Sequence, residues 1–186
     1  IPSTQRVLMP ENAMVRIVEA LPGAGYKLLT DTQAAPVDLL AALDKVQRCL
    51  IVGASDSGKT TLLRHIVARR LNTSKVVCID PHSYPGKWPT GAVVIGQGRD
   101  YDKIDSALTG LVQLMSKRYT DIGRGDVAEM GHDKITILID EWRAITGHVS
   151  GAGDAIKSLL TESRKAAFSV FVASHSDRAK PLGLMG

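Results

Sequence analysis

The sequence predicts an α/β fold in which a mostly parallel central sheet is flanked by helices. Three observations lead to this prediction: five short apolar runs rich in β-branched residues, helical patterns between these runs, and the composition of a single globular domain. None of the runs alternates polar with apolar residues, as is typical of strands that helices cover on both faces. The runs span residues 49–52, 76–79, 92–95, 135–139 and 170–173.

Composition narrows the class of protein. The chain has 186 residues, of which 44% are hydrophobic and 23% charged, and this balance is that of one ordinary globular domain. An isoelectric point near 9.1 permits nucleic-acid binding without requiring it. The two cysteines, Cys49 and Cys78, both lie in apolar runs, so we expect buried thiols rather than a disulfide scaffold.

No apolar run approaches the ~20 residues that cross a bilayer, so no membrane segment is expected in this chain. The chain begins at Ile1 rather than Met, and no charged segment followed by an apolar one resembles a secretion signal. We therefore expect a cytoplasmic fragment of a longer protein.

Residues 1–47 are predicted to form a lead-in segment before a core that spans 48–186. Within the lead-in, residues 15–21 and 26–30 flank a turn rich in proline and glycine, which predicts a hairpin. Residues 36–46 carry a proline in the first turn of a helical pattern, which predicts a short helix.

The longest predicted helix covers residues 104–119, whose apolar side chains keep to one helical stripe. A second helical pattern follows the first core strand, and another precedes the last strand. The stretches 121–133 and 146–154 contain several glycines and little periodicity, so we expect mobile surface loops there. The apolar residues of the three helices are Leu62, Leu63, Ile66 and Val67; Ile104, Leu108, Leu111, Val112, Met115 and Tyr119; and Ile156, Leu159 and Leu160.

A phosphate-binding loop is predicted between the first core strand and the helix after it. Residues 53–60 fit the pattern G-x-x-x-x-G-K-[ST] at every fixed position. This arrangement turns backbone N–H groups and a helix N-terminus onto one point, where they can hold a polyphosphate. We expect Lys59 to reach the β and γ phosphates and the Thr60 hydroxyl to ligate Mg²⁺. The predicted nucleotide-binding residues are Gly53, Ala54, Ser55, Asp56, Ser57, Gly58, Lys59, Thr60 and Thr61.

Two residues of this loop carry further expectations. Asp56 stands where such loops often carry glycine, and its negative charge is expected to lower nucleotide affinity or to raise Mg²⁺ dependence. Aspartate tolerates left-handed backbone angles better than most residues, so the loop geometry can be kept. Lys59 is expected to face solvent in the empty loop, because its charge is needed only for phosphate.

An acidic pair, Asp140 and Glu141, follows the apolar run at 135–139. Successive strand residues point to opposite sides, so the two carboxylates cannot have the same role. Asp140 is expected to hold the Mg²⁺ shell, and Glu141 to orient and deprotonate the attacking water. The second carboxylate favours a hydrolytic motor, and the absence of an Asn-Lys-x-Asp motif favours ATP over GTP.

A small polar residue, Ser174, follows the last apolar run. At the end of a central strand, such a residue can hydrogen-bond the γ phosphate or the attacking water and so sense hydrolysis. The predicted catalytic residues are therefore Glu141, Lys59 and Ser174. His175 and the other four histidines show no metal-ligand spacing, and we interpret them as ordinary surface or packing residues.

With these residues in place, the sequence resembles the FtsK/HerA superfamily of hexameric DNA-pumping ATPases. Asp80-Pro81-His82 is similar to the Asp-Pro-Lys or Asp-Pro-His that follows the second strand in this group. Residues 114–119, Leu-Met-Ser-Lys-Arg-Tyr, are similar to the Glu-Met-Glu-Arg-Arg-Tyr of FtsK-type helices, with the acidic positions replaced. Residues 160–173 and the following Ser174-His175 resemble the basic helix, strand and Ala-Thr-Gln sensor, with His in place of Gln. The resemblance covers residues 46 to 178.

The resemblance implies a RecA-like P-loop NTPase fold of the additional-strand class. In this fold the sensor strand lies between the strands that carry the phosphate loop and the acidic pair. The resemblance further implies an ATPase that uses ATP and Mg²⁺, acts on double-stranded DNA and forms a homo-hexamer in the full-length protein. It also implies that the C-terminal part of the motor is missing, because the family continues past the position of Gly186.

DNA contacts are expected from few of the basic helical residues, since most such charges simply face solvent. A candidate pore loop spans residues 148–157. The basic residues considered are Arg64, Arg69, Arg70, Lys117, Arg118, Arg164 and Lys165.

Two other functions stay open. A P-loop nucleotide or polynucleotide kinase would need an acceptor pocket and a lid, and the acidic pair together with Asp-Pro-His argues against it. A non-hydrolysing DNA-binding or assembly protein would use ATP only as a structural ligand. A measurement of ATP turnover distinguishes such a non-hydrolysing protein from both the motor ATPase and the kinase.

Overall fold

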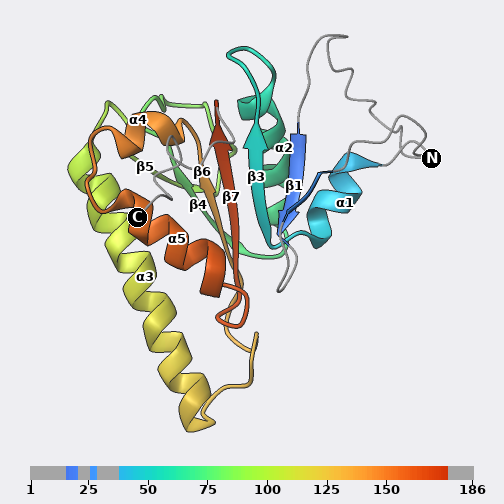
Figure 1. The fold of residues 1–186 in the computed structure, drawn as a ribbon, viewed down its shortest axis with the longest axis vertical. Helices are drawn as coiled ribbons and strands as arrows, with labels where there is room; N and C mark the ends of the chain where they lie inside the picture. Colours follow the sequence, from blue (N-terminus) through green and yellow to red (C-terminus); the bar gives the residue numbers. More distant parts are fainter. Residues whose placement is uncertain (1–15, 21–25, 29–37, 176–186) are drawn as a thin grey trace.

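The computed structural model describes residues 16–20, 26–28 and 38–175, the first two stretches as backbone only. In this part of the chain, seven strands form one sheet in the order β2-β1-β3-β7-β6-β4-β5 (Figure 1). The strands are β1 (Arg16–Ala20), β2 (Tyr26–Leu28), β3 (Arg48–Val52), β4 (Lys75–Ile79), β5 (Val93–Ile95), β6 (Ile135–Ile139) and β7 (Phe168–Ser174). The helices are α1 (Leu39–Lys45), α2 (Lys59–Arg70), α3 (Tyr101–Arg124), α4 (Trp142–Thr146) and α5 (Ala152–Glu162).

The five core strands are parallel to one another, which confirms the predicted fold class. β7 lies between β3 and β6, the position that the resemblance implies for the sensor strand. β1 pairs antiparallel with both β2 and β3, so the predicted hairpin forms and extends the sheet of the core. The division of the chain at residue 47 stays a prediction.

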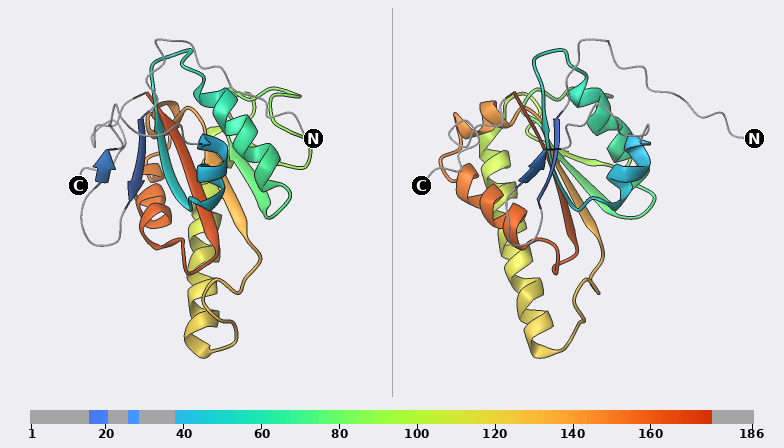
Figure 2. Two further views of the ribbon diagram at one scale, coloured as in Figure 1. Left: turned by 90° about the vertical axis from the view of Figure 1, so that its right-hand side faces the viewer. Right: turned by 45° about the vertical axis from the view of Figure 1, so that its right-hand side comes forward.

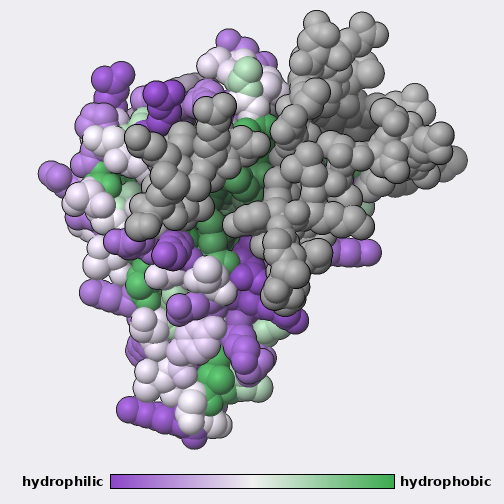
Figure 3. Space-filling model, in the orientation of Figure 1, coloured by the Kyte–Doolittle hydropathy of each residue, from purple (hydrophilic) through white to green (hydrophobic). Residues whose placement is uncertain are grey.

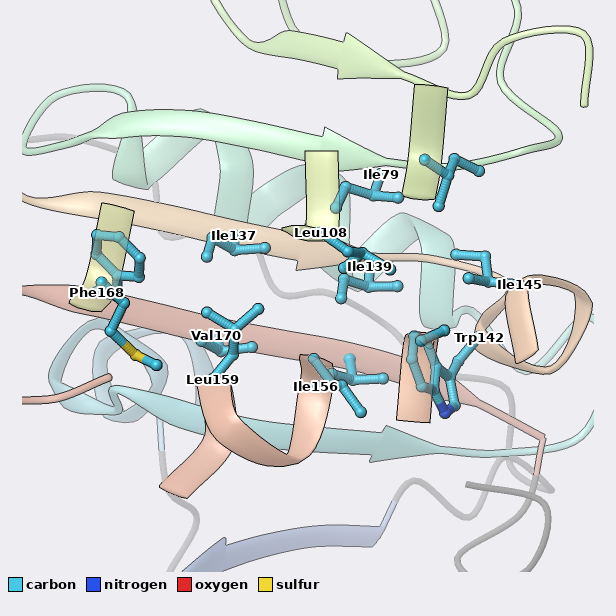
Figure 4. Close-up of a cluster of buried hydrophobic side chains, with 14 of the residues drawn as sticks. Ile79, Leu108, Ile137, Ile139, Trp142, Ile145, Ile156, Leu159, Phe168 and Val170 are labelled. Atoms are coloured by element: carbon cyan, nitrogen blue, oxygen red, sulfur yellow. The ribbon is translucent and has the colours of Figure 1, made fainter. Parts of the chain in front are cut away.

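Helices cover both faces of the sheet (Figure 2). α1 and α2 pack on one face, and α3, α4 and α5 pack on the other. The strand residues alternate between the two resulting cores: Ile137 belongs to the core under α3 to α5, whereas Leu138 belongs to the core under α1 and α2. Figure 4 shows the first of these cores, where Val170 and Ile137 face the apolar sides of α3 and α5.

Burial in these two cores is the main source of stability. Phe168, Phe171 and Trp142 are each at most 1% exposed, and burying a side chain of this size stabilises the fold by about 1.5–3 kcal/mol. Cys49 and Cys78 are buried free cysteines, as predicted. Burial raises the pKa of each thiol to about 12.

Two of the predicted loops are partly helical. α3 continues to Arg124, inside the stretch 121–133, and Gly125 ends it in a left-handed conformation with φ of 78°. A glycine in this position relieves the steric penalty that other residues meet there. The helix, Tyr101–Arg124, extends beyond the predicted stripe of 104–119 at both ends, from the N-cap Asp100, whose side chain accepts the backbone N–H of Lys103, to the C-cap Gly125.

The second predicted loop, 146–154, ends early because α5 begins at Ala152. Ala152 and Ile156 are buried, and their contacts with the core outweigh the cost of Gly153 inside the helix, about 1 kcal/mol relative to alanine. The candidate pore loop 148–157 therefore overlaps a helix, and the expectation of a loop over that whole stretch is wrong.

The C-terminal half of α3 projects beyond the sheet in both Figure 1 and Figure 2. On the face shown in Figure 3, this projecting end is mostly hydrophilic or neutral, with scattered apolar residues. Across the described residues, no helix combines the length and apolar character needed to span a membrane.

Candidate nucleotide-binding site

The predicted phosphate-binding loop joins β3 to α2. Gly58 is the N-cap of α2 with φ of 85°, and Asp56 has φ of 60°. Both angles are left-handed, a conformation that glycine adopts freely and aspartate more readily than most residues. The expectation that Asp56 keeps the loop geometry is confirmed, and its side chain is on the exposed part of the loop.

Gly53 is the first residue of the loop, and its backbone lies close to the side chain of Ser57. A Cβ at this position would collide with the Oγ of Ser57. The Ser57 hydroxyl is buried, and in the part of the chain that is described it has no hydrogen-bond partner. Buried hydroxyls are rarely left unsatisfied, so this atom indicates a place where a ligand oxygen can bind.

Lys59 folds back onto its own loop. Its ammonium donates to the carbonyl oxygens of Gly53, at 2.9 Å, and Ala54, at 2.6 Å. The residue is only 7% exposed, so the prediction that it faces solvent is wrong. A buried ammonium needs acceptors, and the loop carbonyls supply them. The lysine nevertheless lines the cavity that the loop encloses.

Thr60, in the first turn of α2, and Asp140, which follows β6, are in direct contact. The Thr60 hydroxyl donates to Oδ2 of Asp140 at 2.8 Å. Asp140 follows β6, and its backbone N–H donates to the carbonyl of Ile79 at the end of β4. Because parallel strands end at a common edge, the acidic pair lies beside the phosphate loop although 80 residues separate it from Thr60 in sequence.

The Asp140 carboxylate is 1% exposed. Burial raises its pKa, while the hydrogen bond from Thr60 and the nearby ammonium of Lys87 act in the opposite direction. Lys87 Nζ lies 2.7 Å from Oδ2 of Asp80 and 3.5 Å from Oδ2 of Asp140. Burial acts to lower the pKa of Lys87, but the two carboxylates together raise it.

Glu141 adopts a left-handed backbone conformation with φ of 54° at the start of α4. Such an angle is uncommon for a residue other than glycine and costs on the order of 1–3 kcal/mol, and residues of this kind cluster at functional sites. Its Oε2 lies 3.4 Å from Nε2 of His175. Both side chains are 29% exposed, so each can reach a ligand.

A cavity of about 520 Å³, a size typical of ligand sites, lies at this edge of the sheet. Gly53, Ala54 and Asp140 are not among the residues that line it, although Asp140 contacts the lining residue Thr60. The predicted residues Glu141 and 55–61 all line it. His82 and His175 also line the cavity, so the interpretation of these two histidines as ordinary surface or packing residues is wrong, although both fall within motifs that carry the family resemblance.

Ser174 is not among the residues that line the cavity. It is 1% exposed, and its carbonyl accepts the backbone N–H of Gly53 at 3.3 Å. It therefore lies next to the start of the phosphate loop, while the following residue, His175, reaches the cavity. Its sensor role stays a prediction.

Several basic residues considered for DNA contact are engaged within the protein. Arg118 is 7% exposed and donates to the carbonyl of Ala166 at 2.7 Å. Arg70 donates to the carbonyls of Leu43 and Val46. Arg69 pairs with Asp44 and Lys165 with Glu129, whereas Arg64, Lys117 and Arg164 are exposed.

The cavity fits a nucleotide with Mg²⁺. Thr60 and Asp140 offer hard oxygen donors, which Mg²⁺ prefers. Within the described residues, no group of three or more His, Cys, Asp or Glu side chains could hold a metal alone. Mg²⁺ is usually bound by one or two carboxylates together with several waters and substrate phosphate oxygens.

Comparison with known proteins gives matches at the level of fold. No family profile and no curated protein sequence matches the chain. Among solved structures, the pCW3 conjugation coupling protein TcpA, determined as a monomer with ATPγS, is 17% identical with a TM-score of 0.62. The match covers 92% of this chain and 51% of TcpA, so the chain spans about half of that protein.

Two structures of EccC from Thermomonospora curvata also match. The cytoplasmic domain of this type VII secretion ATPase is 16% identical with a TM-score of 0.59, over 72% of this chain and 19% of that one. ATPases 2 and 3 of EccC, in complex with a signal sequence peptide, are 15% identical with a TM-score of 0.58, over 94% and 35% of the two chains. At 15–17% identity these matches show a shared fold, and the chain described here has the α/β fold of a P-loop ATPase domain, as the TcpA and EccC structures do.

Proposed function

We propose that the chain is the ATP-hydrolysing motor domain of a translocase. Lys59 and the backbone of residues 53–61 bind the phosphates of ATP, and Thr60 with Asp140 binds Mg²⁺, which neutralises developing phosphate charge when bound. Glu141 orients the attacking water and accepts its proton.

The observation that carries this proposal is the hydrogen bond between Thr60 and Asp140. It joins the phosphate loop to the acidic pair, and both Thr60 and Glu141 line the cavity. A phosphate loop used only for structural binding of a nucleotide would not require a second carboxylate there. The left-handed backbone of Glu141, which turns the chain at this point, also supports a functional role.

The proposed cargo is double-stranded DNA, moved by a homo-hexamer of the full-length protein in the cytoplasm. The likeness in fold to TcpA, a conjugation coupling protein, supports DNA. The likeness to EccC in complex with a signal sequence peptide supports a second candidate, a polypeptide cargo. Stimulation of ATP hydrolysis by duplex DNA or by a peptide separates the two.

The test measures nucleotide binding by calorimetry and phosphate release by the full-length protein. Glu141→Gln should bind ATP as wild type does but hydrolyse it about 10²–10⁴ times more slowly, because an amide cannot accept the proton of water. Glu129→Gln is the matched control, since Glu129 is exposed and pairs with Lys165. Its rate should equal that of wild type.

Four results would contradict the proposal. Absence of ATP binding would show that the chain has no nucleotide-binding site. Binding without turnover would favour the non-hydrolysing assembly protein, and transfer of phosphate to an acceptor other than water would favour the kinase. A wild-type rate in Glu141→Gln would show that another residue activates water.

A further inference from the structure

Two carboxylates are buried side by side at the ends of neighbouring strands. Asp80 follows β4 and is 0% exposed, and Asp140 follows β6 and is 1% exposed. Burying an ionised carboxylate without a partner is costly, so each needs compensating donors or charge. Lys87, in the segment between β4 and β5, contacts both.

Both carboxylate oxygens of Asp80 accept hydrogen bonds from neighbouring residues. Its Oδ1 accepts the backbone N–H of His82 at 2.9 Å, and its Oδ2 accepts Nε1–H of Trp88 at 3.0 Å. Oδ2 also pairs with the Lys87 ammonium at 2.7 Å. Both oxygens of Asp80 are therefore engaged, and its ion pair holds the Lys87 ammonium in place.

The anchored ammonium reaches the residue that is proposed to hold Mg²⁺. Lys87 Nζ lies 3.5 Å from Oδ2 of Asp140, the same oxygen that accepts the Thr60 hydroxyl. The other oxygen, Oδ1, accepts the backbone N–H of Glu141 at 3.1 Å. The Asp140 carboxylate is thus held from three directions, and Lys87 supplies the charged contact.

We propose that Lys87 is a positioning residue for the Mg²⁺ site: Asp80 and Trp88 fix its ammonium, and the ammonium fixes Asp140 so that the Thr60 hydroxyl donates to it. Because the Thr60 proton is committed to Asp140, the lone pairs of its oxygen remain for the cation. The inference rests on the proposed function, since it assigns Thr60 and Asp140 to Mg²⁺.

The direction in which Mg²⁺ affinity changes when Lys87 is removed distinguishes a positioning role from simple neutralisation of the two carboxylates. If Lys87 only neutralised the two carboxylates, its removal would leave the site more negative and Mg²⁺ would bind more tightly. If Lys87 positions Asp140, its removal loosens the carboxylate and Mg²⁺ binds more weakly. Loss of such outer partners typically lowers metal affinity by about 10–100-fold.

The experiment measures ATPγS affinity by calorimetry in EDTA and across a Mg²⁺ titration, with the full-length protein. For Lys87→Met we expect a rise of about tenfold or more in the Mg²⁺ concentration that gives half of the full change in ATPγS affinity. The affinity in EDTA should change less than about twofold, because Lys87 is not among the residues that line the cavity. Lys103→Met is the matched control: Lys103 also pairs with an aspartate, Asp100, but is 76% exposed.

Lys87→Met leaves two buried carboxylates without a cation, so the variant Asp80→Asn, Lys87→Met is measured with it. This double variant removes one negative and one positive charge and keeps the balance of the buried cluster. It should fold and show the same raised Mg²⁺ requirement, since Asp140 still lacks its charged contact.

An unchanged or lowered Mg²⁺ requirement in either folded variant overturns the proposal. So does an equal loss of affinity in EDTA and in Mg²⁺, which would indicate a general disturbance of the fold. Failure of wild type to bind ATPγS at any Mg²⁺ concentration would instead contradict the proposed function, and the two failures are therefore distinguishable.

Discussion

The imidazole Nε2 of His175 lies 3.4 Å from Oε2 of Glu141. The two residues come from the end of β7 and the start of α4, and both line the cavity. His175 therefore contacts the carboxylate that is proposed to activate water, although its sequence position suggested only a surface or packing role.

Replacing His175 tests this contact. His175→Ala should slow ATP hydrolysis by about 10–100-fold while changing ATP affinity little, because a misoriented general base mainly affects the transition state. His148→Ala is the control, since His148 is exposed and is not among the cavity residues. Ser174→Ala belongs in the same series. A larger rate loss in Ser174→Ala than in His175→Ala would support the predicted sensor role of the serine.

Lys59→Ala should abolish tight binding of Mg·ATP, measured by calorimetry. The variant should keep its circular dichroism spectrum but unfold about 1–3 kcal/mol more easily, because the carbonyls of Gly53 and Ala54 lose their buried donor. Lys157→Ala, an exposed lysine on α5, should change neither quantity. Undiminished ATP affinity in Lys59→Ala would exclude the phosphate-loop interpretation.

Arg118 should matter for stability rather than for DNA. Its guanidinium donates to the carbonyl of Ala166 and lies 4.8 Å from the centre of the Phe168 ring. Arg118→Ala should lower the free energy of unfolding by about 2–4 kcal/mol. The neighbouring exposed Lys117→Ala should change it by less than about 0.5 kcal/mol. Urea denaturation measures both, and equal stabilities would contradict the described packing.

The thiols of Cys49 and Cys78 should resist modification. Their pKa values are raised to about 12 from an ordinary 9.0, so both remain protonated in the folded protein at neutral pH. At about pH 8, a thiol reagent should react quickly with the denatured chain and slowly with the native one.

The same thiols predict how stability depends on pH. Between pH 9.0 and about 12 the unfolded chain loses protons that the folded chain keeps, so the free energy of unfolding falls as pH rises.

Duplex DNA should stimulate ATP hydrolysis by the full-length protein with little preference for base sequence. Contacts to phosphates depend on released counterions, so the stimulation should fall steeply with salt. Phosphate release is followed at several salt concentrations, with light scattering to report assembly. A monomer whose rate ignores DNA at low salt would contradict the DNA-translocase proposal and favour the kinase or the non-motor protein.

The sequence by itself determined the five core strands, the phosphate loop and the acidic pair. Each depends on a local pattern: an apolar run of four or five residues, or a motif of eight residues whose backbone angles are set by its own glycines and Asp56. Interactions between neighbours in sequence specify such features, so they can be read without the tertiary structure.

Only the tertiary structure decided which polar side chains meet at the sheet edge. Lys87 belongs to no motif, and its role follows from β4 and β6 lying side by side, which brings Asp80 and Asp140 to one ammonium. The contact between His175 and Glu141 arises in the same way, since β7 and β6 also lie side by side. The physical reason is that burial and charge pairing depend on distances in space, and residues far apart in sequence set those distances.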